Sequence, residues 1–509
     1  MRRLLALLLL ATATLIAWQA FTPKPNPATT LTVYCAAGLK KPIEALALQF
    51  EQDTGTPISL QYGGTGTLLS QIQVAKTGDL FIAADDGSLA DASKLNLVAE
   101  TLPIAIQHPV IAVKKGNPKA ITDLTTLQAS KFALANPDAA SISKVTRKLL
   151  GDARWTALAS AATVMKPSVT EVAADITLGA IDAAIVWDST VHQFKDLEAI
   201  EFPEGSGHRE NASAAILTAS TQPSLALQFA RYLASPNKGA PIMQAHHFVP
   251  ALGDPYTPKP ELVLYSGGVN RPAIEKLVQQ FADREGVDVT TVFNGCGILC
   301  ATMKALDKTS GSKMPDAYYA CDVCFVPPVA DQFPEAVLLT ETAIIIATPK
   351  GNPKKIATLA DLAQPGLKLG VCNAEQSTLG FMTQAMLKST NLLDSVMKNV
   401  VVQVPTADFL VNQMRAGALD AAIVYQVSIQ QVAEHFDAIP LPKDIARAVQ
   451  PFAVRKDSHH YHLSQRLLAY LRAHRSAFED AGFIWKGESK PIPSNQLEIP
   501  AHLKGAGGS

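Results

Sequence analysis

The chain contains the same domain-length pattern twice. Three pairs of segments recur in the same order: LTVYCAAGLKKPIEALALQFEQDTG (31–55) with LVLYSGGVNRPAIEKLVQQFADREG (262–286), KKGNPKAITDL (114–124) with PKGNPKKIATL (349–359), and GAIDAAIVW (179–187) with GALDAAIVY (417–425). Solenoid repeats have periods of roughly 20–50 residues, so this much longer spacing indicates duplication of a whole domain. The two copies can be compared position by position: shared residues indicate scaffold, and differing residues in a shared site indicate a difference in function.

Composition supports well-packed globular domains. Of 509 residues, 48% are hydrophobic and 17% are charged, which is typical of folded chains and unlike disordered ones. A chain of this length is expected to hold several domains of about 100–200 residues each. The net charge is −1, and the sequence has neither a basic stripe nor a nucleic-acid-binding motif. We therefore expect no nucleic acid partner.

The N-terminus has the pattern of a targeting segment. Arg2 and Arg3 precede an uncharged, mostly apolar run that ends near Phe21. A basic flank before such a run is typical of an export signal, and roughly 18 apolar residues are near the lower limit for a membrane span. Residues 1–21 are thus a cleaved signal peptide or an uncleaved anchor that contacts the membrane, with its arginines in the cytoplasm. Either alternative makes the rest of the chain periplasmic or extracytoplasmic.

These features predict the domain organisation. We expect a signal peptide or anchor (1–21), a Pro-rich spacer (22–30), a first domain (31–250), a linker (251–261), a second domain (262–500) and a tail (501–509).

Each copy has the pattern of an α/β domain. After a first short apolar strand, apolar residues fall at i, i+3, i+4 and i+7, which indicates a helix with one buried face: Ile43, Leu46, Ala47 and Phe50 in the first copy, and Ile274, Leu277, Val278 and Phe281 in the second. Further strands and helices alternate, which predicts a parallel sheet with helices on both faces. A long apolar segment midway is expected to cross into a second lobe. The predicted fold is α/β, with two tandem domains, each of two α/β lobes around a central cleft.

A Gly-rich loop in the first copy could hold an anion. Residues 63–67 read GGTGT and lie between a predicted strand and a predicted helix. The free N–H groups and positive dipole end of a helix N-terminus bind anions without a formal charge. Small residues let the backbone approach a ligand, and the hydroxyls of Thr65 and Thr67 add donors. The alternative is a tight strand-to-helix turn without a ligand.

The ordered motifs resemble the type II periplasmic solute-binding proteins of ABC transporters, most closely the molybdate-binding family. The matching segments are VYCAAGL, FEQDTG, GGTGTL, GDLFIAAD, VKKGNP and GAIDAAIVW in the first copy, and YSGG, FADREG, NGCGIL, PDAYYACD, TPKGNP and GALDAAIVY in the second. The resemblance implies a protein that is not an enzyme, captures a small oxyanion between its lobes and delivers it to an inner-membrane ABC permease.

The resemblance also implies ligand-binding positions. In the first copy they are Ala36, Ala37, Gly38, Thr65, Gly66, Thr67, Val172 and Trp187, and in the second copy they are Ser266, Gly267, Cys296, Gly297 and Tyr425. The serines of the family fall on Gly38 and Thr65 in the first copy, and its tyrosine falls on Trp187. Trp187 could stack on a ligand or fill the cleft wall. We expect an oxyanion in the first copy, with the identity of the ion left open.

Five of the six cysteines lie in the second copy: Cys296, Cys300, Cys321, Cys324 and Cys372. One interpretation is disulfides, for example Cys296–Cys321 with Cys300–Cys324, because export favours oxidation, although the spacing does not fix the pairing. A second is a tetrathiolate site for zinc, copper(I) or an iron–sulfur centre, which would be the protein's only cofactor. A third is thiol chemistry, because a helix N-terminus would lower the pKa of Cys296.

Two of the six cysteines, Cys372 and Cys35, carry less information. Cys372 is expected in a loop that faces the cleft, where it would complete a site or remain a spare thiol. Cys35 is expected to be a small buried residue of the first strand. The alternatives to a transport receptor are therefore a soft-metal-binding or thiol-redox protein on a duplicated scaffold, and a membrane-anchored sensor or scaffold.

Overall fold

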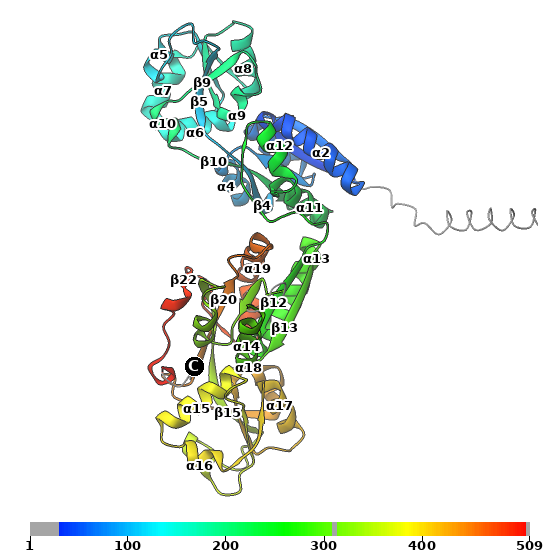
Figure 1. The fold of residues 1–509 in the computed structure, drawn as a ribbon, viewed down its shortest axis with the longest axis vertical. Helices are drawn as coiled ribbons and strands as arrows, with labels where there is room; N and C mark the ends of the chain where they lie inside the picture. Colours follow the sequence, from blue (N-terminus) through cyan, green and yellow to red (C-terminus); the bar gives the residue numbers. More distant parts are fainter. Residues whose placement is uncertain (1–29, 308–312, 505–509) are drawn as a thin grey trace, which may run out of the picture. The chain divides into compact units, whose positions relative to one another are not determined.

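The computed structural model describes residues 30–307 and 313–504, and the chain forms two compact units that divide between Gly253 and Asp254 (Figure 1). This division falls inside the segment expected to be the linker. The expected signal peptide or anchor (1–21) lies outside the described residues. Within the part of the chain that the structure describes, no helix is both long and apolar enough to cross a membrane.

The first domain has one sheet in each of its two lobes. The strands are β1 (Leu31–Ala36), β2 (Ile58–Gly63), β3 (Leu80–Ala83), β4 (Val98–Gln107), β5 (Pro109–Lys114), β6 (Phe132–Ala135), β7 (Val164–Lys166), β8 (Ala183–Trp187), β9 (Leu197–Ile200), β10 (Glu210–Leu217) and β11 (Val249–Pro250). The first lobe has the order β11-β4-β10-β3-β1-β2, and the second lobe has the order β7-β6-β8-β5-β9.

Helices cover these sheets (Figure 1). They are α2 (Lys40–Thr54), α3 (Thr65–Ala75), α4 (Asp86–Lys94), α5 (Leu124–Gln128), α6 (Ser141–Leu150), α7 (Asp152–Ala161), α8 (Val169–Thr177), α9 (Asp188–Val191), α10 (Pro203–Ser206), α11 (Pro223–Ala234) and α12 (Gly239–Ala245), with a 3-10 turn, η1 (Ala37–Leu39), before α2.

The second domain repeats this plan. Its strands are β12 (Glu261–Gly267), β13 (Asp288–Asn294), β14 (Ala317–Tyr319), β15 (Glu335–Pro349), β16 (Leu369–Cys372), β17 (Val400–Val404), β18 (Ala421–Tyr425), β19 (Phe436–Pro440), β20 (Arg447–Val454), β21 (Ile484–Trp485) and β22 (Ile492–Pro493). Its helices are α13 (Arg271–Glu285), α14 (Cys296–Asp307), α15 (Thr378–Ser389), α16 (Leu393–Met397), α17 (Ala407–Arg415), α18 (Gln426–Ile429), α19 (Tyr461–Ala473) and α20 (Arg475–Asp480).

The strand order of the second domain, β13-β12-β14-β20-β15-β21 in one lobe and β17-β16-β18-β15-β19 in the other, matches that of the first domain, and β22 pairs with β15 in addition. The expectation of a parallel sheet was wrong for part of each lobe. Strands β1, β2 and β3 are parallel, but β10 and β4 are antiparallel to their neighbours. The reason is that β10 re-enters the first lobe from the second, so it runs against the strands that begin there.

The crossing between lobes differs between the copies. In the second domain one strand, β15, runs through both sheets, and the N–H of Ile344 donates to the carbonyl of Ala446 (2.8 Å). The first domain has Pro109 at the matching position, and its strand is interrupted at His108. Proline has no N–H to donate to a ladder, which accounts for the break.

The predicted amphipathic helix is present in both copies. Helix α2 buries Ile43, Leu46 and Phe50, and it ends at Gly55 in the left-handed conformation (φ +74°). Helix α13 ends in the same way at Gly286 (φ +66°). A left-handed residue after the last turn is the usual glycine C-cap, so this repeated Gly is explained by helix termination.

The hydrophobic cores of the two domains are organised differently. In the first domain the buried residues of the second lobe form a cluster of their own. In the second domain one continuous cluster includes residues of both lobes, among them Cys321 and Tyr425. It also includes Leu503, which follows the expected domain end at 500. The 3-10 turn Ala501–Leu503, which lies in the segment expected to be a tail, thus packs on the core of the second domain through Leu503.

Candidate ligand-binding clefts

A small cavity lies between the two lobes of the first domain, where several helices begin. Its lining residues are Ala36, Ala37, Gly38, Leu39, Gly63, Gly64, Thr65, Ala84, Gln107, Ala140, Ser141, Ile142, Ser168, Val169 and Trp187. None of these described residues is charged. The cavity volume is about 20 Å³, and by the same measure one water molecule needs roughly 10–15 Å³. The cavity therefore suits a ligand of few atoms.

Helix N-termini from both lobes converge on this cavity. Thr65 is the first residue of α3, Ser141 is the first residue of α6, and Ser168 caps α8. The N–H groups of a first helical turn have no partner within the helix, and the helix dipole is positive there. The side chains of Thr65 and Ser141 are buried, at 2% and 5% exposure. The cavity wall thus presents backbone and hydroxyl donors without a formal charge.

Two other polar lining residues are held by the protein itself. The Ser168 hydroxyl donates to the Glu171 carboxylate (2.8 Å) and accepts from the Glu171 N–H (3.3 Å). The Gln107 amide donates to the carbonyl of Ala84 (2.9 Å) and accepts from the hydroxyl of Ser189 (3.0 Å). These bonds fix the shape of the wall.

The lobes of the first domain are closed on each other. The N–H of Gly66 in the first lobe donates to the carbonyl of Ala139 in the second (2.9 Å), and the amide of Gln193 in the second lobe donates to the carbonyl of Gly38 (2.7 Å). A Cβ at Gly64 would lie 2.3 Å from the oxygen of Ala139. Closure therefore depends on a glycine at this position.

The structure brings together five of the eight first-copy positions: Ala36, Ala37, Gly38, Thr65 and Trp187 line the cavity. Gly66, Thr67 and Val172 do not. The Gly66 N–H is bonded to Ala139, and the Thr67 side chain points to solvent. Val172 is fully buried in the core of the second lobe. Trp187 is 1% exposed, so it forms part of the wall and also faces the cavity.

The second domain has a larger cavity, of about 110 Å³. It is lined by Gly268, Val269, Arg271, Pro272, Asn294, Gly295, Cys321, Ser377, Pro405, Thr406, Ala407, Asp408, Tyr425 and Ser428. Unlike the first cavity, it has charged groups in its wall. The guanidinium of Arg271 lies over the ring of Phe293 (4.6 Å), as Lys40 lies over Tyr62 (5.1 Å) at the matching place in the first domain.

Of the five second-copy ligand positions, Tyr425 lines this cavity, and its buried hydroxyl has no hydrogen-bond partner among the described residues. Ser266, Gly267, Cys296 and Gly297 are absent from the lining. Ser266 is fully buried and accepts a hydrogen bond from the Asn270 amide.

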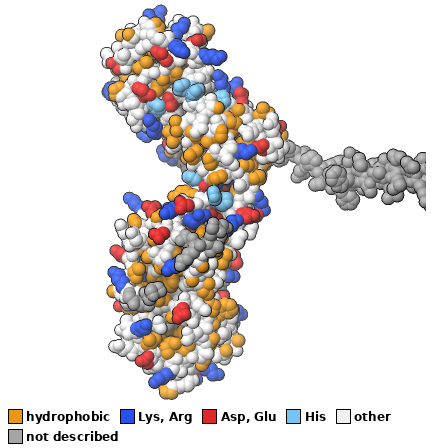
Figure 2. All heavy atoms as spheres, viewed as in Figure 1, with side chains coloured by type: hydrophobic (Ala, Val, Ile, Leu, Met, Phe, Trp, Pro, Cys, Tyr) orange, Lys and Arg blue, Asp and Glu red, His pale blue; other side chains and the backbone are white. Residues whose placement is uncertain are grey.

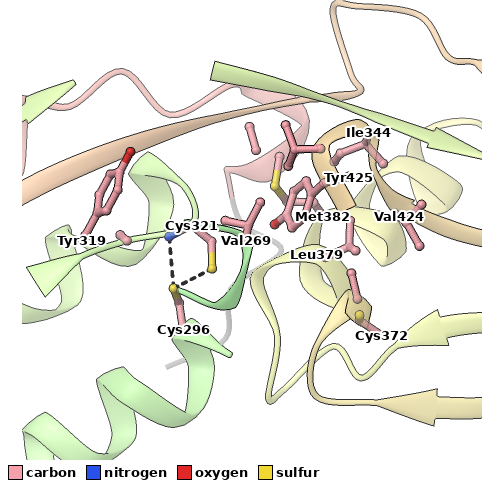
Figure 3. Close-up of a cluster of buried hydrophobic side chains, with 14 of the residues drawn as sticks. Val269, Cys296, Tyr319, Cys321, Ile344, Cys372, Leu379, Met382, Val424 and Tyr425 are labelled. Atoms are coloured by element: carbon pink, nitrogen blue, oxygen red, sulfur yellow. Dashed lines mark hydrogen bonds between the residues drawn. The ribbon is translucent and has the colours of Figure 1, made fainter. Parts of the chain in front are cut away.

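All six cysteines are free thiols, and only one pair lies within bonding reach. The sulfurs of Cys296 and Cys321 are 2.9 Å apart, and the Cys321 N–H donates to the Cys296 sulfur (3.1 Å) (Figure 3). The Cys300 thiol donates instead to the carbonyl of Phe325 (3.2 Å). Within residues 30–307 and 313–504, no three Cys, His, Asp or Glu side chains form a group that could hold a metal. The four-thiol metal site, the second of the three interpretations of the cysteines, is therefore not formed among these residues.

The remaining cysteines lie elsewhere. Cys324 is half-buried in a 3-10 turn, and its N–H is bonded to the Asp322 carboxylate (3.1 Å). Cys372 is the last residue of β16 and is buried, so the expectation that it lies in a loop was wrong. Burial raises the pKa of Cys372 to about 12. Cys35 is fully buried on β1, as expected for a small core residue.

The close thiol pair is electrostatically asymmetric. Burial acts to raise the pKa of Cys296, but hydrogen bonds from Cys321, Tyr318 and Thr378 outweigh it, so the pKa is lowered. The hydrogen bond to Cys296 and burial raise the pKa of Cys321 well above its usual range. Cys296 also begins helix α14, where the dipole favours a thiolate. Within the pair, Cys296 is therefore the more acidic thiol and Cys321 the less acidic one.

The second-lobe half of the first cavity, in particular Ser141 and Ser168, was not predicted from the sequence. A signal for Ser168 exists, because Ser168 and Glu171 have the S-x-x-E spacing of a capping box. The structure forms half of that box: the Glu171 N–H donates to the Ser168 hydroxyl, but the Glu171 carboxylate accepts from the same hydroxyl and not from the Ser168 N–H. Ser141 begins α6, but nothing in the local pattern directs that helix end toward the Gly-rich loop of the other lobe.

Comparison with known proteins agrees with this architecture. The profile of the family described as bacterial extracellular solute-binding protein matches residues 31–249 and 262–484. A binding protein of Haemophilus influenzae is 29% identical over 228 residues, covering 44% of this chain and 92% of the relative. The molybdate-binding protein ModA of Mycobacterium bovis is 26% identical over 228 residues, covering 43% and 86%.

Among solved structures, the periplasmic molybdate-binding protein of Azotobacter vinelandii matches with a TM-score of 0.36 and 20% identity, covering 43% of this chain and 98% of that one. The family match spans most of both domains, and the description of the family places its members outside the cytoplasm. The chain therefore belongs to the bacterial extracellular solute-binding proteins, as a tandem duplication of the type II periplasmic binding domain with similarity to molybdate-binding proteins.

Proposed function

We propose that the protein serves an ABC transporter and that its first domain captures a small oxyanion such as molybdate, tungstate or sulfate. The observation that carries this proposal is the convergence of helix N-termini on one uncharged cavity. Thr65, Ser141 and Ser168 bring the starts of three helices to it. Such an arrangement favours an anion, because the positive ends of the helix dipoles face the cavity and no charged side chain lines it.

The size of the cavity supports an inorganic ion. A volume of about 20 Å³ in the closed domain leaves little room beyond a central atom and its oxygens. An uncharged wall also suits an ion that must be released again, because release then breaks no ion pair between the anion and a Lys or Arg side chain. Similarity to a molybdate-binding protein is consistent with this ligand class.

The proposed partner is an inner-membrane ABC permease that receives the ion when the lobes open. Opening and closing would be a hinge motion around the two crossings between the lobes. In this proposal the protein performs no catalysis, and its first domain needs no cofactor. Residues 1–21 would export the protein or anchor it outside the cytoplasm.

A thermal-shift series tests the ligand class. Saturating ligand at about 100 times Kd stabilises a domain by about 2.7 kcal/mol, which raises the Tm of a domain of this size by roughly 5–10 °C. We expect molybdate, tungstate or sulfate at millimolar concentration to produce such a shift in the full chain, and a hexose phosphate to produce none. No shift with any of these oxyanions, or an equal shift with the hexose phosphate, would contradict the proposal.

A further inference from the structure

We propose that Cys296 and Cys321 form a disulfide bond beside the second cleft, by exchange with a small disulfide oxidant, while Cys300, Cys324 and Cys372 remain thiols. The first observation is proximity: the two sulfurs lie 2.9 Å apart, and no other pair of described cysteines is placed in this way. The sequence allowed three ways to pair four cysteines into two disulfides. The structure favours a single disulfide, between Cys296 and Cys321.

A glycine makes room for this pair. A Cβ at Gly267 would lie 2.2 Å from the Cys321 sulfur and 3.2 Å from the Cys296 sulfur. The backbone does not itself require glycine there, since Gly267 has φ −58° and ψ 137°, and Ala36 at the matching position has φ −55° and ψ 130°. Glycine at 267 is thus explained by the sulfur atoms beside it.

Three differences between the copies meet at this point. Where the second domain has Gly267, Cys296 and Cys321, the first has Ala36, Thr65 and Ala84, and all three of those residues line the first cavity. The second copy has therefore replaced part of a ligand-binding wall with two thiols and the space that they need. An isolated spare cysteine would not need the accompanying glycine.

Disulfide formation needs one sulfur that the oxidant can reach and a second thiol beside it that can attack the mixed disulfide. Cys321 lines a cavity that is also lined by Arg271 and Pro272, whose side chains are exposed, so a small oxidant can reach its sulfur. Cys296 is buried at the N-terminus of α14, where its pKa is lowered.

Two exchange steps complete the reaction. In the first, the Cys321 sulfur attacks one sulfur of the oxidant R–S–S–R, the oxidant's S–S bond breaks, and the first RS group leaves with the Cys321 proton as RSH. In the second, the Cys296 sulfur attacks the Cys321 sulfur of the mixed disulfide, and the second RS group leaves with the Cys296 proton as RSH. The sum converts two thiols and R–S–S–R into the protein disulfide and two RSH, so two electrons pass from the protein to the oxidant. An extracytoplasmic location supplies such oxidants.

The test uses the full chain, equilibrated with oxidised glutathione and digested with trypsin without reduction. Cleavage after Arg284, Lys304, Lys313 and Lys350 places Cys296 and Cys300 in one peptide and Cys321 and Cys324 in another. We expect the two peptides to be joined in the wild type, and to separate on reduction. Thiol counting under denaturing conditions should give four free thiols before reduction and six after it.

Single variants assign the bond. The joined peptide should persist in Cys300→Ser and Cys324→Ser and disappear in Cys296→Ser and Cys321→Ser. Gly267→Ala should lower its yield at least tenfold, while Gly267→Ala with Cys321→Ala, which reproduces the first copy at two of these three positions, should keep the wild-type circular dichroism. Six free thiols in the wild type, or loss of the joined peptide in Cys300→Ser, would overturn the proposal. Neither outcome bears on oxyanion binding by the first domain, which is measured separately.

Discussion

At the scale of single residues, one position shows how the two copies have diverged. Thr65 and Cys296 are both the first residue of a helix that follows the second strand, and both are buried. Thr65 offers a hydroxyl donor to a cavity without charged walls. Cys296 offers a thiol that is hydrogen-bonded to the thiol of Cys321, and Cys296 is absent from the lining of the second cavity. The same backbone frame thus supports a ligand donor in one copy and a thiol pair in the other.

This comparison predicts the effect of removing the hydroxyl. Thr65→Ala should weaken oxyanion binding roughly 10- to 100-fold, because a hydrogen bond to a charged group contributes about 1.5–3 kcal/mol. Thr67→Ala is the matched control: Thr67 lies two residues further along the same helix with its side chain exposed, so its Kd should stay at the wild-type value. Isothermal titration of the full chain measures both. Equal losses in the two variants would argue against a contact from Thr65.

At the scale of elements, local sequence patterns predicted where strands and helices lie better than they predicted which elements pack against one another. The apolar spacing of Ile43, Leu46 and Phe50 predicted helix α2 because a buried face has a helical period. The direction of β10 was missed, because strand direction depends on where the chain returns from the other lobe. The cleft was half predicted for the same reason: Thr65 lies in a recognisable Gly-rich loop, but Ser141 and Ser168 reach the cavity only through the packing of the second lobe.

One contact between elements is expected to respond to pH. The rings of His192, after α9, and His247, after α12, stack across the two lobes of the first domain with centroids 4.5 Å apart. Burial and then His247 lower the pKa of His192, against an opposing effect of Asp188. Burial, Lys41 and His247 lower the pKa of the neighbouring His246.

The sign of the pH effect follows from these lowered values. Below the ordinary histidine pKa of 6.5, the unfolded chain takes up protons before the folded domain does, so stability falls as the pH falls through 6.5 toward the folded pKa. We expect the Tm of the first domain to decrease over this range, and to decrease less in His192→Gln. The exposed His435 of the second domain provides the control, and His435→Gln should follow the wild-type profile. A His192→Gln profile that coincides with the wild type would contradict this role.

At the scale of the whole molecule, the chain combines two units of the same plan with different interiors. The units divide at Gly253, and each has its own sheets and cavity. The core of the second domain is continuous across its lobes, and its cavity wall includes charged groups and Cys321. On the face that Figure 2 shows, basic and acidic side chains are interspersed over both units, as the net charge of −1 suggests. This face therefore shows no broad patch of a single charge.

Two independent units predict two calorimetric transitions. An oxyanion should raise the Tm of one transition only, because the proposed site lies in the first domain. A reductant should lower the Tm of the other transition only, because the proposed disulfide lies in the second. Scanning calorimetry of the oxidised full chain, with and without each addition, measures both effects. A single additive that shifts both transitions equally would show that the domains do not act separately.

The most direct test of oxyanion capture by the first domain is a molybdate titration of two matched glycine variants. A Cβ at Gly64 would lie 2.3 Å from the oxygen of Ala139, and a Cβ at Gly295, the matching residue, would lie 2.2 Å from the oxygen of Gln376. Each substitution should therefore obstruct closure of one cleft while leaving its backbone unstrained. We predict one molybdate per wild-type chain, binding weakened at least tenfold by Gly64→Ala, and wild-type binding in Gly295→Ala. Wild-type binding in Gly64→Ala, or its loss in Gly295→Ala, would contradict the account.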